Sequence, residues 1–220
     1  MVNRPQNVFL PFTIYHLPFT RIEIVNTSYA KAETLTSAIL APLDLARSVA
    51  LVIGFSLLTA LAAQVVIPLP PVPITAQTFA VLLTGALLGS RLGALAMIAY
   101  LIEGASGLPF FYGGHGGVQH LFGPTGGYLL SYPLAAFVVG LLAERGLDRR
   151  FLTAAAAMTL GSIVILLCGW AWLSRFTGPQ LALYEGVTKF LLGDAIKIAL
   201  AAAALPSGWS ILRRTSLRKD

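Results

Sequence analysis

Near its C-terminus the chain reads Phe190-Leu-Leu-Gly-Asp-Ala-Ile-Lys-Ile-Ala-Leu-Ala-Ala-Ala-Ala-Leu205, an apolar stretch that is long enough to enter a lipid bilayer and carries only two charges. Asp194 and Lys197 are three residues apart, which on a helix is about 300° of rotation, so both side chains project from one face. Charges at membrane depth cost on the order of 2.5–3.5 kcal/mol each, so they usually face a cavity or a partner. The stretch predicts either a polar site inside a membrane bundle or a buried ion pair that only holds helices together.

The composition also places the chain in a membrane. Of its 220 residues 56% are hydrophobic and 11% are charged, and the mean hydropathy is +0.78, whereas a soluble domain carries about 25% charged residues. A water-soluble fold of this size would lack the polar surface to cover itself. The net charge of +6 does not indicate nucleic-acid binding, because no basic stripe interleaved with aromatic residues accompanies it. The single cysteine, Cys168, excludes an internal disulfide.

The hydropathy pattern predicts an all-α membrane protein, a polytopic bundle of about six transmembrane helices. Prolines and glycines separate the apolar windows, because proline removes an N–H donor and glycine favours non-helical dihedral angles. We expect residues 45–210 to form one transmembrane domain, since no domain boundary interrupts them. The predicted helices, some of them short, are Leu45–Val66, Ala76–Gly89, Leu92–Gly104, Gly127–Ala143, Leu152–Leu173 and Val187–Leu205.

The distribution of lysine and arginine predicts that both termini are cytoplasmic and that Arg175 is the clear external exception, with Lys189 near a helix start. Residues 1–44 are expected to be a flexible cytoplasmic leader, because no uninterrupted apolar run follows a basic start as in a signal peptide. An amphipathic surface helix around Tyr29–Leu43 is the alternative. Residues 211–220 are expected to be a basic cytoplasmic tail. The basic residues placed on the inner side are Arg47, Arg91, Arg145, Arg149, Arg150, Arg213, Arg214, Arg218 and Lys219.

Two of the loops placed outside lack acidic and basic residues. These are the proline-rich segment Pro68–Pro73 and the glycine-rich segment Gly107–Gly127. Such loops suit closure over a small ligand; flexible connectors of no further function are the alternative.

Several segments that resemble phosphate-binding or metal-binding motifs do not indicate an enzyme or a metal site. The segments Gly113–Gly117 and Gly123–Gly127 do not continue into Gly-Lys-Ser/Thr, so the chain has no Walker A loop and is not expected to be an ATPase. His115 and His120 have no cysteine or acidic residue beside them, so no zinc site is expected. Glu103 ends the third predicted helix, either at the outer interface or as an intramembrane proton relay.

Six segments of the chain, taken in order, carry a family resemblance: Val65–Thr78, Leu87–Ala96, Gly104–Phe110, Gly113–Gly117, Gly123–Tyr128 and Phe190–Lys197. Over about Arg47 to Leu205 they resemble the pattern of the BioY biotin transporters. The resemblance implies a substrate-capture (S) subunit of an energy-coupling-factor transporter, a bundle of about six helices that binds biotin from outside. It also implies that an ABC-type ATPase pair and a transmembrane coupling protein are separate chains. The long leader and Glu103, where an apolar residue is expected, depart from the pattern.

The resemblance and the chemistry of biotin together give candidate substrate-binding residues. Asp194 and Lys197 match the family's Gly-Asp-x-x-Lys motif; Asp194 can accept from ureido N–H groups and Lys197 can pair with the carboxylate. Tyr100 can cover the ring system. Gln77 is an amide partner or, alternatively, a helix cap, and Tyr128 is expected to be an interface anchor.

Two other functions stay open at this point. The chain could capture another small vitamin, or it could be an integral membrane enzyme that uses Asp194 as an acid or base with Glu103 as its partner. The expectation is a transporter subunit in the plasma membrane, with biotin, the coupling protein, the ATPases and the lipid bilayer as partners and with no nucleic acid, cofactor or metal.

Overall fold

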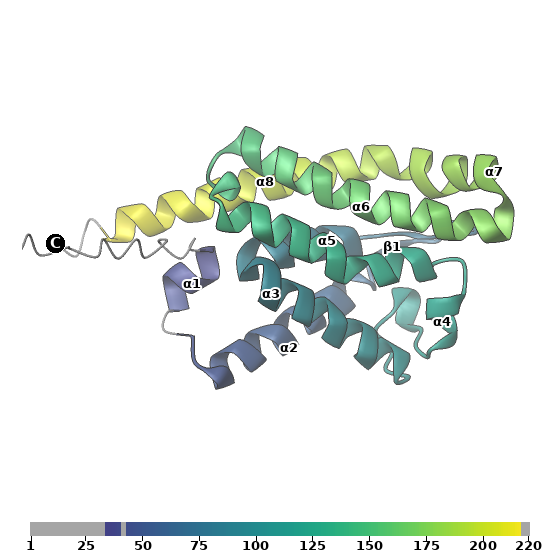
Figure 1. Ribbon diagram of the computed structural model, residues 1–220, viewed down its shortest axis with the longest axis horizontal. Coiled ribbons are helices and arrows are strands. Elements are labelled where there is room, and N and C mark those ends of the chain that lie inside the picture. The colour runs from purple at the N-terminus through teal and green to yellow at the C-terminus, as the bar shows by residue number, and fades with distance from the viewer. Residues whose placement is uncertain (1–33, 41–42, 217–220) are drawn as a thin grey trace, which may run out of the picture. The chain divides into compact units, whose positions relative to one another are not determined.

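The computed structural model describes residues 34–40 and 43–216, and most of these residues are helical (Figure 1). The elements in chain order are α1 (Leu35–Leu40), α2 (Leu45–Ala62), β1 (Val66–Ile67), β2 (Ile74–Thr75), α3 (Gln77–Ala105), the 3-10 turn η1 (Tyr112–Gly114), α4 (Gln119–Phe122), α5 (Gly126–Glu144), the 3-10 turn η2 (Leu147–Arg149), α6 (Phe151–Thr177), α7 (Pro179–Leu183), the π-helical turn η3 (Tyr184–Thr188) and α8 (Lys189–Ser216).

Five of the described helices are long and apolar enough to cross a membrane, the fifth running from α7 into α8. Many large apolar side chains point outward; Leu45, Leu152 and Leu192, for example, are each more than three-quarters exposed. Such faces are unfavourable in water and favourable against lipid. The prediction of a helical multi-pass membrane protein is confirmed.

Helix α3 doubles back on itself. In a straight helix, residues 77 and 100 would lie about 34 Å apart, yet the Gln77 amide nitrogen lies 2.5 Å from the Tyr100 hydroxyl oxygen. The chain reverses at Gly89, whose φ of 84° and ψ of −179° are not helical. The predicted helices Ala76–Gly89 and Leu92–Gly104 are therefore the two antiparallel arms of α3, and counting them separately gives the expected six helices.

The reversal of α3 defines the two ends of the bundle. Gly89 lies against Thr34 and the carboxylate of Glu144, at the end that also carries α1 and η2. The strands β1 and β2, which pair antiparallel, lie with η1, α4 and α7 at the other end, called the pocket end below. Three connections between the long helices thus share the pocket end, where they can shape a binding site.

Close backbone contacts hold the core together. A side chain at Gly85 would overlap the backbone of Ala136, and one at Gly140 would overlap the backbone of Gly89. Glycine at these positions lets α5 approach the first arm of α3 and its reversal closely, which brings the packed backbones within range of dispersion contacts. Helix α6 packs on the other side of α5, and α8 lies beside α6 (Figure 1).

The last helix extends further in both directions than predicted. The window Val187–Leu205 corresponds to the middle of a helical segment that runs from Pro179 to Ser216 through the π-helical turn η3. The tail predicted from residue 211 is therefore helical as far as Ser216. Of the predicted leader, α1 contacts α3 and α8, and residues 1–33 lie outside the described residues.

Candidate functional site

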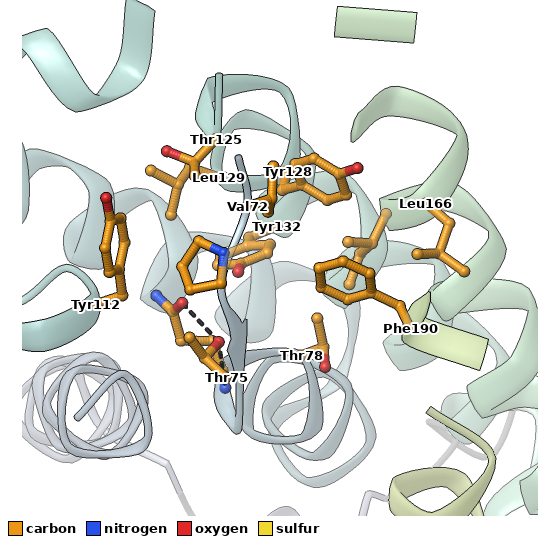
Figure 2. A pocket seen from close by; sticks show the side chains of 13 residues that line it. Val72, Thr75, Thr78, Tyr112, Thr125, Tyr128, Leu129, Tyr132, Leu166 and Phe190 are labelled. Carbon is orange, nitrogen blue, oxygen red and sulfur yellow. Dashed lines mark hydrogen bonds between the residues drawn. The ribbon is translucent and has the colours of Figure 1, made fainter. Parts of the chain in front are cut away.

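The pocket end holds a partly open pocket, whose empty volume is about 470 Å³ when the open space at its mouth is counted. Every lining residue is uncharged. The lining consists of Val72, Pro73, Thr75, Gln77, Thr78, Tyr112, Thr125, Tyr128, Leu129, Tyr132, Ile165, Leu166 and Phe190 (Figure 2).

Aromatic rings form opposite walls of this pocket, with Tyr112 on one side and Phe190 on the other (Figure 2). Tyr128 stacks on Phe190 with ring centroids 6.0 Å apart, and its hydroxyl donates a hydrogen bond of 2.8 Å to the carbonyl of Gly186. The expectation that Tyr128 anchors the chain at the membrane interface is wrong, because this side chain is buried in the bundle and lines the pocket. Its hydroxyl instead fixes the π-helical turn.

The charged pair lies behind the polar wall of the pocket. Asp194 is only 5% exposed, and one of its carboxylate oxygens accepts hydrogen bonds from Lys197 at 3.3 Å and Thr78 at 3.5 Å. Its other oxygen accepts from the Ser162 hydroxyl at 2.5 Å. The Lys197 ammonium also donates to the Thr78 hydroxyl at 2.8 Å. Thr78 lines the pocket, so one hydroxyl separates the ion pair from the cavity.

Gln77 and Tyr100 are in contact, but only Gln77 lines the pocket. The carbonyl oxygen of Gln77 accepts from the Thr75 hydroxyl at 2.8 Å. Tyr100 lies behind Gln77 and is fully buried; its ring stacks on Tyr132 with centroids 6.3 Å apart. Tyr112, Tyr128 and Tyr132 supply the tyrosine rings of the lining in its place.

The remaining sequence candidates form no catalytic or metal site among the described residues. His115 and His120 have ring centroids 5.3 Å apart, and burial together with the neighbouring His115 lowers the pKa of His120. No group of three or more His, Cys, Asp or Glu residues that could hold a metal ion occurs in the described part of the chain. Glu103 has one buried oxygen without a hydrogen-bond partner, whereas the Asp194 carboxylate is bonded to Thr78, Ser162 and Lys197.

The fold and the pocket place this chain in a known class of membrane protein. Its structure resembles the crystal structure of the S-component for biotin from an ECF-type ABC transporter, with a TM-score of 0.66 and 27% sequence identity over 80% of this chain and 92% of that chain. The fold is therefore that of an S component.

Sequence comparison identifies the family within this class. The profile of the BioY family matches residues 29–214. A probable biotin transporter BioY from Pyrococcus horikoshii is 44% identical over 71% of this chain and 92% of its own length. The biotin transporter BioY from Thermotoga maritima is 41% identical over 67% of this chain and 87% of its own length. The chain belongs to the BioY family.

Proposed function

We propose that this chain captures biotin at the outer face of the plasma membrane and delivers it as the S component of an energy-coupling-factor transporter. Relatives that are named biotin transporters, and the structural likeness to an S-component for biotin, support this assignment over an enzyme. A transmembrane coupling protein and ABC-type ATPase subunits, encoded as separate chains, supply the energy. The fold provides the binding pocket.

The observation that carries the proposal is the match between the pocket and the chemistry of biotin. A thioether ring and a valeryl chain are apolar, and the lining offers aromatic and aliphatic side chains for them. The ureido group has two N–H donors and one carbonyl acceptor. The polar wall formed by Thr75, Gln77 and Thr78 offers both acceptors and donors for it.

The charged pair lies behind Thr78, whose hydroxyl is bonded to both Asp194 and Lys197. Asp194 can accept from ureido N–H groups and Lys197 can pair with the carboxylate, as the family motif implies. Without ligand the two charges pair with each other at 3.3 Å. Because biotin carries its ureido group and carboxylate at opposite ends, Lys197 serves the carboxylate only if its flexible four-carbon stem swings away from Asp194.

The proposed orientation puts the pocket end outside and both termini inside. Basic residues are concentrated at the opposite end of the bundle, as the positive-inside rule requires of a cytoplasmic face. Two exceptions at the pocket end have local partners: Arg175 lies 4.9 Å above the Trp172 ring, and Lys189 pairs with Glu185 at 2.5 Å. The basic residues at the opposite end are Arg47, Arg91, Arg145, Arg149, Arg150, Arg213 and Arg214.

Calorimetric titration of the detergent-solubilised chain tests the proposal. We expect saturable binding of biotin with one site per chain, because the lining residues surround one cavity. Thiamine and riboflavin, titrated in parallel, are expected to give no saturable signal, since their ring systems differ from biotin in shape and hydrogen-bonding pattern. Binding of one of these vitamins in preference to biotin would establish the alternative, an S component for another substrate.

The purified chain is expected neither to bind nor to hydrolyse ATP, because its glycine-rich segments lack the lysine and hydroxyl that complete a phosphate-binding loop. Concentrative uptake is then expected only when the coupling protein and ATPases are co-expressed. The measurement is ATP hydrolysis across the fractions of a size-exclusion run. ATP hydrolysis that co-elutes with this polypeptide would contradict the proposal that separate subunits supply the ATPase activity.

A further inference from the structure

A chain of hydrogen bonds runs from the pocket wall to an outer loop. The Thr75 hydroxyl donates to the carbonyl oxygen of Gln77 at 2.8 Å. The Gln77 amide nitrogen donates to the Tyr100 hydroxyl at 2.5 Å, and that hydroxyl donates to the carbonyl of Phe110 at 3.0 Å. Gln77 and Tyr100 belong to different arms of α3, so this chain also joins the two arms.

The direction of these bonds follows from the donors available. A tyrosine hydroxyl has one hydrogen, and the Phe110 carbonyl can only accept it. Tyr100 must therefore accept from Gln77, which places the amide nitrogen toward Tyr100 and the amide oxygen toward Thr75. The orientation of the Gln77 amide thus depends on Tyr100. This orientation decides on which side the amide offers the pocket an N–H donor and on which side a carbonyl acceptor.

The far end of the chain lies in the glycine-rich segment. Phe110 is followed by Phe111, which is fully buried against Tyr100 with ring centroids 5.7 Å apart. Tyr112, the next residue, lines the pocket. The carbonyl that Tyr100 holds is therefore two residues from an aromatic wall of the pocket, so a shift of this segment moves that wall.

We propose that Tyr100 is a positioning residue that holds the Gln77 amide in one orientation and couples it to the seating of residues 107–118. The inference rests on the proposed biotin site, but it assigns Tyr100 no contact with the ligand. An amide held in one orientation favours a ligand that presents a matching donor and acceptor, and a seated loop keeps Tyr112 in the wall. Recognition and loop seating are then linked through one hydroxyl.

A double-mutant cycle separates positioning from contact. Tyr100→Phe keeps the ring, and we expect the affinity for biotin to fall about five- to tenfold because the amide loses its anchor. In a Gln77→Ala background the same change is expected to cost less affinity, since no amide remains to be positioned and only the effect on residues 107–118 persists. An equal loss in both backgrounds would overturn the proposal, because Tyr100 would then act on the ligand independently of Gln77.

Hydrogen exchange on the ligand-free protein tests the coupling to the loop without relying on biotin. Tyr100→Phe is expected to increase amide exchange in residues 107–118, whereas Tyr184→Phe, which alters an exposed tyrosine at the pocket end, is not. Unchanged exchange in Tyr100→Phe would overturn the coupling. If the wild-type chain shows no biotin binding, the proposed function fails and this measurement still decides the coupling.

Should Tyr100→Phe not fold, Thr75→Val tests the opposite anchor of the amide. It removes the hydroxyl that donates to the Gln77 carbonyl oxygen and keeps a similar shape. Because Thr75 also lines the pocket, Thr75→Val is expected to weaken biotin binding in both backgrounds, and by more where the Gln77 amide is present. Equal losses in both backgrounds would show that the amide is not held by this chain of hydrogen bonds, which would overturn the proposal.

Discussion

Lys197→Ala and Asp194→Asn are each expected to weaken biotin binding about 10- to 150-fold while the bundle stays folded, because each removes a charge-assisted hydrogen bond worth about 1.5–3 kcal/mol. The fold tolerates either change for a local reason. Ser162 and Thr78 still donate to the residue at 194 after Lys197 is removed, and Thr78 still accepts from Lys197 after Asp194 is changed. The measurements are calorimetric affinity and the melting temperature in detergent.

A second ion pair on the same helical segment supplies the matched control. Glu185 and Lys189 lie 2.5 Å apart at the pocket end, and neither lines the cavity. Lys189→Ala therefore removes a comparable charge and is expected to change biotin affinity less than twofold. Unaltered binding in both Lys197→Ala and Asp194→Asn would assign the deeper pair a purely structural role.

The ligand can be altered instead of the protein to find which group Lys197 meets. Biotin methyl ester lacks the carboxylate charge and is expected to bind the wild-type chain more weakly than biotin. In Lys197→Ala the ester and biotin should bind almost equally, since the cation that distinguishes them is gone. If the ester binds the wild-type chain as tightly as biotin, Lys197 does not meet the carboxylate. Lys197 would then stay paired with Asp194 at 3.3 Å and lie near the ureido group of the ligand.

Sequence patterns predicted the helices well because lipid imposes a simple requirement on length and hydropathy. The predicted ends were least accurate for the last helix, Val187–Leu205, because the helical segment runs from Pro179 to Ser216. Hydropathy treats Arg175, Glu185 and Lys189 as isolated charges, whereas in the structure Arg175 covers an aromatic ring and the other two pair with each other. Charges with partners are compatible with a helix that continues.

The site was predictable only where its residues carry unusual chemistry for a membrane. Two charges in an apolar stretch marked Asp194 and Lys197. Ser162 and Thr78 hold them, yet a single hydroxyl in an apolar helix is unremarkable in sequence, and these partners lie 32 and 116 residues from Asp194 along the chain. Tyr128 was misassigned for a related reason: a tyrosine at a helix start resembles an interface anchor until its neighbours are known.

Gly89→Ala is expected to lower the free energy of unfolding by about 1–3 kcal/mol, because φ near 84° with ψ near 180° is a conformation that essentially only glycine adopts. The added methyl would also lie 2.6 Å from a carboxylate oxygen of Glu144. That oxygen accepts from the backbone N–H and the hydroxyl of Ser90, so displacing it breaks both bonds at the turn. For a chain of this size the melting temperature should fall by about 2–12 °C.

Gly54→Ala is the matched control, because Gly54 lies in α2 and nothing lies within 4 Å of the position its side chain would take. It is expected to leave the melting temperature unchanged or raise it, since alanine favours a helix by about 1 kcal/mol over glycine. Repeating Gly89→Ala in a Glu144→Ala background removes the steric conflict and keeps the backbone strain. If the loss of stability persists in that background, glycine is required by the backbone conformation at the reversal of α3. If the loss disappears there, glycine is required because a side chain would clash with the Glu144 carboxylate. No loss in either background would contradict the backbone conformation on which the six-helix count depends.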